Sequence, residues 1–349
     1  MRNIFIAFFT ALLLCSCGAS TPAHKKSKSG IAVLETVRLG GLDHSVLIRG
    51  ADASGPIILV LHGFAVPMMP FAHLGYADDG GLIEQKYIVV NYDQRGAGKT
   101  SRNDTDKSTY NINQYVQDAE ELAAYLRKRF NRDKIFLQGV SWGSIIGMHL
   151  IQRHPDWFYA YLAEGQASNM QAVYADAAKF ARTEAEAEKN EKAVADLSSA
   201  GLPDVSRTDS ENIKSIEIIV KWLDMYSQKK FHLQDMTGLF FKSIREAPEY
   251  SFLDMLALLR SMNSFTENNT VPMLKTDLNK EVPEVKVPVY WIYGEYDLMK
   301  SEGKKYYDRL RAPKKKWIEI KGGGHSPSAD RPEETEKLYL EILSENAKR

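Results

Sequence analysis

The chain has 349 residues, of which 44% are hydrophobic and 26% charged, with 45 basic and 45 acidic side chains. This composition is that of a globular protein, and the length suffices for one large domain or for a core that carries an insertion. The balanced charge excludes a general electrostatic attraction to nucleic acid or to anionic lipid.

The N-terminus has the pattern of an export signal. Arg2 precedes an apolar run over residues 4–14, which is too short to span a bilayer but matches the core of a secretory signal. The run ends in Leu-Cys-Ser-Cys-Gly, which resembles a bacterial lipoprotein signal with Cys17 as the lipid acceptor, although Cys15 departs from the usual small or aliphatic residue. The resemblance implies that residues 1–16 are removed and that the protein is exported and lipid-anchored on the periplasmic or cell-surface side of a bacterial membrane. Cleavage by the general signal peptidase, without lipid, is the alternative.

Both cysteines lie in this N-terminal segment, so the folded body would contain none. An exported domain without disulfides must be stabilised by its own hydrophobic core. Residues 17–31 are small, polar and basic and predict a flexible tether between the membrane and the folded domain.

From residue 32 onward, strand-like and helix-like segments alternate. Continuous aliphatic runs predict strands buried on both faces, and apolar residues at helical spacing predict the helices between them. This alternation indicates a parallel sheet covered on both faces, built from residues 32–165 and 285–349. The predicted strands are Val33–Leu39, Ser45–Ile48, Ile57–Leu61, Tyr87–Tyr92, Lys134–Leu137, Phe158–Ala163, Val289–Tyr293 and Trp317–Ile320, and the predicted helices are Tyr115–Phe130, Ser144–Arg153, Gly303–Leu310 and Glu333–Leu343.

The middle of the chain, residues 166–284, departs from this alternation. It has helical patterns, clearest over 213–226 and 252–262, and no convincing buried strand. Helices inserted after the sixth strand predict a cap over the open end of the strands.

The stretch DQRGAGKTS, Asp93–Ser101, contains the end of a phosphate-binding loop pattern. Its first position is Asp93 instead of glycine, and a carboxylate there would repel phosphate. The residues after it, 101–106, are turn formers instead of a helix whose N-terminus would face the anion. We therefore expect no nucleotide binding.

The stretch KIFLQGVSWGS contains the pattern Gly-x-Ser-x-Gly between an aliphatic strand and a helix. This is the setting of a nucleophile elbow, in which the serine lies on a tight turn above the sheet edge. The predicted nucleophile is Ser141.

A serine hydroxyl needs a base, which is itself oriented by a carboxylate. In this fold the chain order is serine, acid, histidine. Asp297 follows a predicted strand and is the expected acid, with Glu295 and Glu164 as competitors. His325 follows three glycines after the next strand and is the expected base, because ligands bind at the carboxyl ends of parallel strands.

An oxyanion needs two backbone N–H donors. One should come from Trp142, which follows the nucleophile, and the other from Phe64, in the loop after the third strand. His62, which precedes that turn, is expected to be structural.

Together, the HG pair after the third strand, DQRGAGKTS, GVSWGS, GEYD and GGGHS resemble the proline iminopeptidase branch of the α/β-hydrolase superfamily. The resemblance implies a mostly parallel eight-stranded sheet with helices on both faces and an inserted helical cap. It also implies that Asp93–Ser101 supports the floor of an active site. Two departures bear on the acyl pocket: the usual HGGPG reads HGFAVP here, with Phe64 in place of a glycine, and Val140 replaces a glycine of the elbow.

We therefore expect a serine hydrolase that acts by acyl transfer, most simply an aminopeptidase that releases an N-terminal residue such as proline from a small or short-peptide substrate. An esterase of small or lipid-like acyl groups and a non-catalytic binding protein are the alternatives. No cofactor, metal, nucleotide or nucleic acid is implied. An aminopeptidase must recognise a free α-ammonium group, for which Glu164 is the first candidate. The cap contains Glu184, Glu186, Asp224, Asp235 and Asp254 as others.

Overall fold

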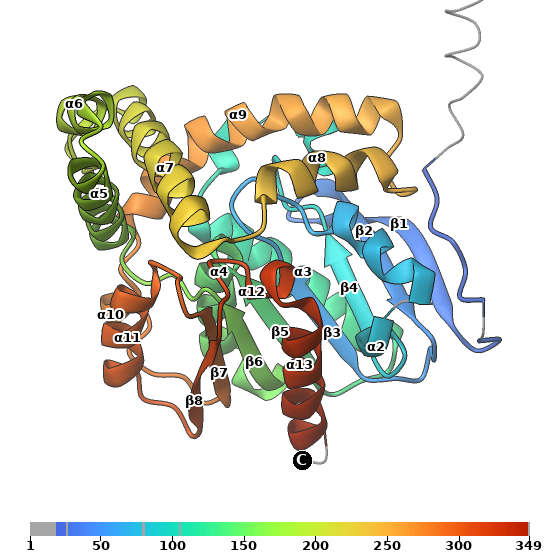
Figure 1. The fold of residues 1–349 in the computed structure, drawn as a ribbon. Coiled ribbons are helices and arrows are strands. Elements are labelled where there is room, and N and C mark those ends of the chain that lie inside the picture. Colours follow the sequence, from blue (N-terminus) through green and yellow to red (C-terminus); the bar gives the residue numbers. More distant parts are fainter. Residues whose placement is uncertain (1–18, 26, 79–80, 105, 348–349) are drawn as a thin grey trace, which may run out of the picture.

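The computed structural model describes residues 19–25, 27–78, 81–104 and 106–347 (Figure 1). The expected signal segment and the lipid acceptor Cys17 therefore lie outside the described residues.

The centre of the molecule is one eight-stranded sheet with the order β1-β2-β4-β3-β5-β6-β7-β8 (Figure 1). β1 pairs antiparallel with β2, and β2 with β4, whereas all later pairs are parallel. β1 and β8 form the two edges. The strands are β1 (Ile31–Leu39), β2 (Leu42–Gly50), β3 (Ile57–Leu61), β4 (Ile88–Tyr92), β5 (Ile135–Val140), β6 (Phe158–Glu164), β7 (Val289–Gly294) and β8 (Lys315–Ile320).

Helices cover both faces of this sheet because its central strands are apolar on both sides. In β3, Leu59 and Leu61 pack in the larger cluster with α3 (Ile112–Arg129) and α4 (Trp142–Arg153). Ile58 and Val60 point to the opposite face and share a cluster with α13 (Pro332–Asn346). The α/β class expected from the sequence is confirmed. The other helices of the core are α2 (Gly81–Glu84), α11 (Lys300–Arg309) and α12 (Pro327–Asp330), with the 3-10 segments η1 (Met69–Asp78), η2 (Thr100–Arg102), η3 (Lys107–Thr109) and η4 (Pro155–Trp157).

Between β6 and β7 the chain forms a helical layer that lies over the carboxyl edge of the sheet (Figure 1). We call this layer the cap. α5, α6 and α7 enclose their own buried cluster, in which Ala181, Trp222 and Tyr226 meet. Side chains cap the N-termini of the five longest helices of the cap, for example Thr208, which forms a reciprocal capping box with Glu211 at the start of α7. The cap helices are α5 (Met170–Ala187), α6 (Glu191–Ala200), α7 (Asp209–Phe231), α8 (Met236–Glu246), α9 (Phe252–Lys275) and α10 (Leu278–Glu281).

The segment that precedes β1 differs from the expected flexible tether. Over its described part, Arg49 of β2 donates to Thr21 Oγ1 at 2.7 Å and to the Pro22 carbonyl at 2.5 Å. His24 is buried, with Nε2 3.5 Å from Glu84 Oε2. The polar composition of the segment suggested solvation, but a buried arginine gives these polar groups partners inside the fold.

Among the helices built from described residues, none combines the length and the apolar character needed to cross a bilayer.

Candidate active site

Ser141 lies at the sharp turn between β5 and α4. Its backbone has φ 50° and ψ −114°, a conformation that is sterically unfavourable for a residue with a side chain. The turn is held in place because Ser141 N–H donates to the Glu164 carbonyl at 2.9 Å. Gly143 is required on the other side of the turn, since a Cβ there would lie 2.1 Å from the Leu61 carbonyl oxygen.

His325 and Asp297 come to this turn from two loops that follow neighbouring strands. Asp297 follows β7, and His325 follows β8. His325 Nε2 is 3.0 Å from Ser141 Oγ, and His325 Nδ1 is 3.1 Å from each carboxylate oxygen of Asp297. The three predicted residues therefore form a continuous hydrogen-bonded chain in the order serine, histidine, aspartate.

The electrostatic environment of His325 favours its protonated form. Burial alone would lower its pKa, but the attraction of Asp297 and the hydrogen bond that the ring donates to that carboxylate raise the pKa above its ordinary value of 6.5. Asp297 is 4% exposed, and its Oδ1 also accepts from Met299 N–H at 2.9 Å. The carboxylate is thus fixed where it orients the ring and stabilises an imidazolium.

Gly165 lets the histidine approach the end of β6. It has φ 62°, and a Cβ at this position would lie 2.8 Å from His325 Cε1. Any side chain here would combine backbone strain with a contact against the ring.

The predicted oxyanion donors lie on segments that the sheet register brings together. β3 and β5 are parallel neighbours with Leu61 opposite Gly139, so the turns after both strands meet. A Cβ on Gly63 would lie 3.9 Å from Ser141 Cβ, which places the first loop beside the nucleophile. Trp142 is the first residue of α4, where a backbone N–H has no partner within the helix.

The ring of Phe64 belongs to an aromatic cluster that joins this loop to the cap. It packs edge-on against Trp142, with ring centroids 5.5 Å apart, and against Phe265 of α9, at 5.1 Å. The residue that replaces the expected glycine therefore connects the oxyanion loop to a cap helix.

Gln94 is a buried residue that the sequence analysis did not single out. Its side-chain amide donates to the His62 carbonyl at 3.0 Å, and its Oε1 accepts from Trp142 Nε1 at 3.0 Å. His62 Nε2 accepts from Gln94 N–H at 3.0 Å, and burial lowers the pKa of His62 to about 4, which keeps it neutral. Gln94 thus links the oxyanion loop to the residue after the nucleophile.

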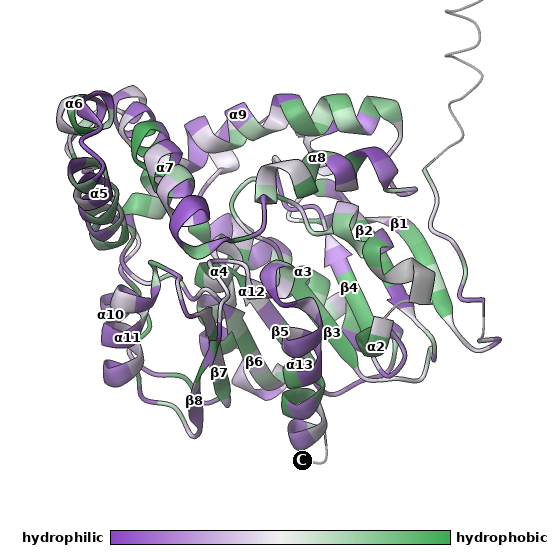
Figure 2. Ribbon diagram, in the orientation of Figure 1, coloured by the Kyte–Doolittle hydropathy of each residue, from purple (hydrophilic) through white to green (hydrophobic). Residues whose placement is uncertain are grey.

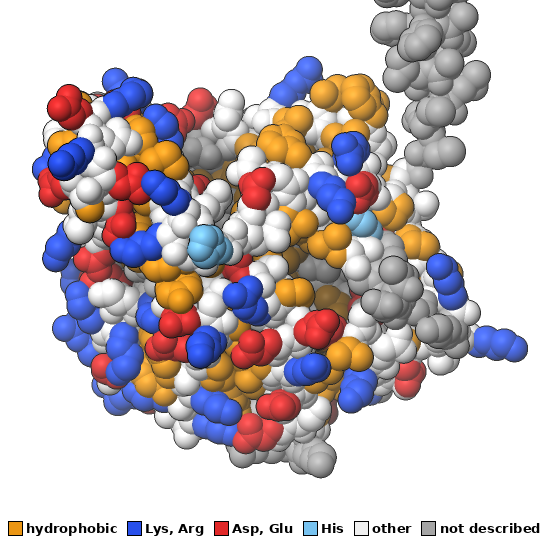
Figure 3. Space-filling view, in the orientation of Figure 1, with side chains coloured by type: hydrophobic (Ala, Val, Ile, Leu, Met, Phe, Trp, Pro, Cys, Tyr) orange, Lys and Arg blue, Asp and Glu red, His pale blue; other side chains and the backbone are white. Residues whose placement is uncertain are grey.

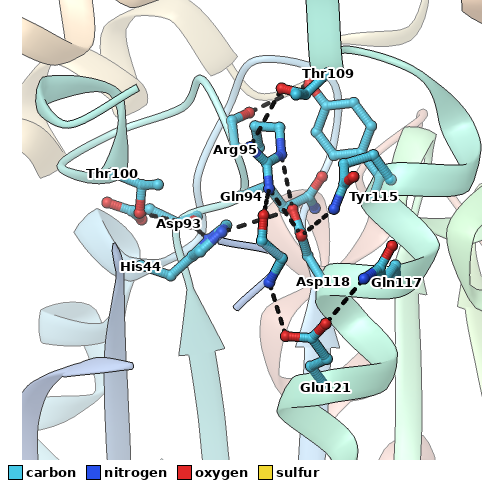
Figure 4. A network of polar contacts seen from close by, with 12 residues as sticks. His44, Asp93, Gln94, Arg95, Thr100, Thr109, Tyr115, Gln117, Asp118 and Glu121 are labelled. Carbon is cyan, nitrogen blue, oxygen red and sulfur yellow. Dashed lines mark hydrogen bonds and ion pairs between the residues drawn. The ribbon is translucent and has the colours of Figure 1, made fainter. Parts of the chain in front are cut away.

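The rest of Asp93–Ser101 is anchored to the core beneath the site (Figure 4). Arg95 donates from Nε and Nη2 to the two carboxylate oxygens of buried Asp118, both at 3.0 Å, and to the Gly40 carbonyl. Gln114 completes the environment of Asp118 by donating to Oδ1. A bidentate pair of this kind fixes both position and orientation.

Asp93 and Lys99 join the same stretch to the cap. Tyr250, in the turn before α9, donates its hydroxyl to Asp93 Oδ2 at 2.5 Å. Lys99 Nζ donates to Asp254 Oδ2 at 2.8 Å and to the Glu249 carbonyl at 2.9 Å. Burial raises the pKa of Asp93 to about 7 even though Tyr250 stabilises the carboxylate. The lysine of the apparent phosphate pattern is therefore engaged with a cap carboxylate.

The structure gives the first candidate for the substrate ammonium, Glu164, a different place. Glu164 is 1% exposed, and its carboxylate accepts from Tyr339 Oη at 2.5 Å and from Ser328 N and Oγ. It holds the segment after His325 against β6 and offers no accessible oxygen to an ammonium group. Glu295, the other competing acid, accepts from Gly322 N–H at 2.9 Å and supports the histidine loop.

Of the five candidate cap acids, Glu186 of α5 and Asp224 of α7 are solvent-accessible, and neither forms an ion pair in the described part of the chain. Asp224 differs from Glu186 because it interacts electrostatically with His325. Partial dehydration raises its pKa, and the attraction of His325 partly offsets this rise. Asp224 in turn raises the pKa of His325, so the two side chains are near enough to interact electrostatically. Of the other candidates, Glu184 pairs with Lys230, Asp235 caps α8 and Asp254 binds Lys99 and Arg102.

A pocket of ≈ 710 Å³ lies between the cap and the acid loop. Phe231, Tyr296, Asp297 and Trp317 are among its lining residues, but neither Ser141 nor His325 lines it. Of the hydrogen-bonded chain formed by Ser141, His325 and Asp297, the aspartate alone borders this pocket. In the described part of the chain, no three histidine, cysteine or acidic side chains are grouped to hold a metal ion.

Comparison with known proteins relates this geometry to a superfamily. The family model described as serine aminopeptidase, S33, matches residues 53–217. The probable aminopeptidase YbaC of Bacillus subtilis is 28% identical over 327 residues, which cover 92% of this chain and 98% of that protein. A probable proline iminopeptidase of Streptomyces coelicolor is 33% identical over 93 residues, or 26% of this chain and 28% of that protein.

Among solved structures, the proline iminopeptidase of Mycobacterium smegmatis superposes with a TM-score of 0.62 at 17% identity, covering 90% of this chain and 98% of that one. A thermophilic esterase of Thermogutta terrifontis superposes with a TM-score of 0.55 at 15% identity, covering 90% and 99%. At such identities the likeness concerns the fold, which is that of the α/β hydrolases.

Proposed function

We propose that this chain, which belongs to the α/β-hydrolase superfamily, is a serine hydrolase that removes an N-terminal residue from a short peptide or an aminoacyl amide. The observation that carries the proposal is the hydrogen-bonded chain from Ser141 through His325 to Asp297. It lies at the carboxyl ends of parallel strands, where α/β sheets bind their ligands. The similarity of nearly the whole chain to a probable aminopeptidase supports cleavage of the bond that follows an N-terminal residue.

The proposed reaction begins when His325 Nε2 accepts the proton of Ser141 Oγ as this oxygen attacks the acyl carbon. Negative charge develops on the former carbonyl oxygen, which the N–H groups of Phe64 and Trp142 would stabilise. The imidazolium, stabilised by Asp297, then donates its proton to the leaving nitrogen, and the acyl–nitrogen bond breaks. Water repeats these steps, with His325 again as base, and releases the free amino acid and Ser141.

Asp224 supports an aminopeptidase over an esterase. The free α-ammonium group of a substrate bound at Ser141 needs an accessible carboxylate, and Asp224 is an exposed carboxylate of α7 that interacts electrostatically with His325. A charge-assisted hydrogen bond of this type contributes about 1.5–3 kcal/mol. An esterase has no use for such a group, whereas the ring of Phe64 beside the elbow would suit an apolar acyl chain and keeps the esterase as the second candidate.

The test compares proline-arylamide, its N-acetylated form and simple aryl esters on the purified full-length protein. Proline-arylamide should be cleaved, and acetylation should remove most of the kcat/KM because it neutralises the ammonium group. Ser141→Ala should lower turnover by several orders of magnitude for every substrate. Equal cleavage of the acetylated compound, or turnover of uncharged esters alone, would establish the esterase instead.

We also propose that the protein is exported and anchored through lipid on Cys17, on the strength of the signal pattern around that residue. Two or three acyl chains give stable anchoring, where one gives marginal binding. Wild-type protein should then partition with membranes, and Cys17→Ser should prevent maturation to the lipid-bearing form. A soluble product whose N-terminus begins at Ala19 or later would refute the anchor.

A further inference from the structure

The outer faces of α8 and of the first turns of α9 carry exposed apolar side chains. The inner faces of both helices pack on one buried cluster that includes Leu47 and Met69, so the two helices form a single layer there. On the outside, Phe252 and Leu253 are 61% and 57% exposed. Hydrophobic residues gather on this end of α9 in Figure 2 and at the corresponding place of the surface in Figure 3. We call Phe241, Phe252, Leu253 and Leu259 the α8–α9 apolar face.

Exposed basic side chains accompany this apolar face. Lys242 and Arg245 lie on the same helix as Phe241, where Arg245 also pairs with Glu246, and Arg260 follows Leu259 on α9. Apolar side chains flanked by lysine and arginine are typical of surfaces that enter the boundary between lipid headgroups and acyl chains. Scattered exposed leucines are ordinary, but large apolar side chains gathered on one layer indicate a binding surface.

The N-terminal segment is fixed beside this face. Ser20 N–H donates to the carbonyl of Pro248, which lies in the turn between α8 and α9, at 3.0 Å. Arg49 holds the next residues, Thr21 and Pro22, against β2. Three peptide units separate Ser20 from Cys17, and fully extended they span about 11 Å. A lipid on Cys17 would therefore enter the bilayer within about that distance of the α8–α9 turn.

We propose that the α8–α9 apolar face rests on the lipid bilayer and fixes the orientation of the protein on the membrane. The proposal rests on the anchor at Cys17 proposed above. Because only three peptide units separate Cys17 from Ser20, some surface near Pro248 must touch the headgroups. The surface next to Pro248 is apolar and has basic side chains at its border. Inserting Phe252 and Leu253 among the lipids removes these side chains from water.

The experiment uses the full-length, lipid-bearing protein in vesicles of phosphatidylcholine and phosphatidylglycerol. A polarity-sensitive fluorophore is attached to Leu253→Cys or, as matched control, to Leu202→Cys, which is similarly exposed but follows α6 at the far end of the cap (Figure 1). The parent chain, whose own cysteines are Cys15 and Cys17, gives the labelling background. Vesicles with brominated acyl chains should reduce the emission at position 253 at least two-fold and leave position 202 unchanged.

Two outcomes would overturn the proposal while leaving the anchor in place. In one, the protein floats with the vesicles and position 253 is not quenched. In the other, positions 253 and 202 are quenched equally, which would mean that no single face is presented. If the wild-type protein does not float with the vesicles, the anchor itself fails, and the orientation proposal fails with it. Unchanged hydrolase activity of both labelled variants controls for folding.

Discussion

Asp224 and His325 influence each other across the space between α7 and the histidine loop, and this coupling makes the role of Asp224 measurable in two ways. Because the pKa of His325 is raised, the base is protonated and inactive at low pH. The kcat/KM should rise with pH through a midpoint above the ordinary value of 6.5. Asp224 raises the pKa of His325, so removal of its negative charge must lower this midpoint for every substrate, with or without an amine.

The first prediction is therefore that Asp224→Asn lowers the acid-limb midpoint of kcat/KM for both an ester and a free-amine substrate. For the free-amine substrate alone, kcat/KM on the plateau should also fall roughly ten- to a hundred-fold, since a charge-assisted hydrogen bond is lost. Asp209→Asn removes the same charge from the exposed start of the same helix and should change neither. A plateau loss of equal size on the ester would show that Asp224 does not bind the amine.

Gln94 is a positioning residue, since it touches the oxyanion loop and the elbow but not the reacting atoms. Gln94→Met keeps the size of the side chain and removes its bonds to the His62 carbonyl and to Trp142 Nε1. Charge on the oxyanion exists in the transition state and not in the bound substrate, so kcat should fall roughly ten- to a hundred-fold with little change in KM.

The control for this second prediction is Gln138→Met. Gln138 lies on β5, and its side chain donates to Tyr339 of α13 and not to the oxyanion loop. Both variants should lose some thermal stability, but only Gln94→Met should lose kcat. A rise in KM with normal kcat would contradict the positioning role.

At the scale of elements, the link between β4 and the cap depends on a buried acid. Burial raises the pKa of Asp93 to about 7 from an ordinary value of 3.8. The unfolded chain therefore loses this proton at lower pH than the native state does. The stabilising effect of the protonated group is complete below about pH 4 and is lost as pH rises toward 7, by up to ~1.4 kcal/mol for each pH unit.

The third prediction is that protonated Asp93 stabilises the fold less as pH rises. The free energy of unfolding of the wild type, relative to Asp93→Asn, should fall between pH 4 and pH 7 when it is measured by urea denaturation. Asp308→Asn, which removes an exposed carboxylate, should give a nearly constant difference over the same range. A difference that increased with pH would mean that Asp93 is stabilised as a carboxylate, with Tyr250 and the Lys99 amide outweighing burial.

At the scale of the whole molecule, the N-terminal segment is part of the fold. Arg49→Lys keeps a cation near Glu84, but a single ammonium cannot also reach Thr21 and Pro22. The fourth prediction is that this variant accelerates amide hydrogen exchange of residues 19–24 roughly ten-fold or more, since a hydrogen bond to a charged group is lost. Arg38→Lys, on an exposed pair of β1, should leave that exchange unchanged. Equally fast exchange in the wild type would mean that the segment is not held.

The sequence predicted those features that depend on local pattern. The strand Ile57–Leu61 agrees with β3 because a continuous aliphatic run has one simple interpretation, and the α/β class followed from the alternation of such runs with helices. β8 begins two residues earlier than expected, since Lys315 and Lys316 are polar residues on an edge strand. The residues expected to form the triad lie within hydrogen-bond distance in the structure, although their catalytic roles stay a prediction until turnover is measured.

Features that depend on tertiary contacts were not accessible from the sequence. The choice among the cap acids required the ion pairs of Glu184 and Asp254 and the electrostatic interaction of Asp224 with His325. Gln94 carries no spacing signal, because its partners lie on two other strand ends. The order in the segment before β1 depends on Arg49, which gives polar residues buried partners that composition cannot reveal.

β8 is an edge of the sheet, and no strand among the described residues pairs with its outer side. Proteins held on a membrane move in two dimensions, where copies of the chain collide far more often than in bulk solution. An unpaired strand is a template for joining sheets from separate molecules into insoluble polymers. The charged side chains of Lys316 and Glu319 project from β8, and burying them in such a joint would strip them of water. The charged side chains of this edge strand thus oppose such joining, and they would matter most if the proposed anchor concentrates the protein on a membrane, whatever its substrate.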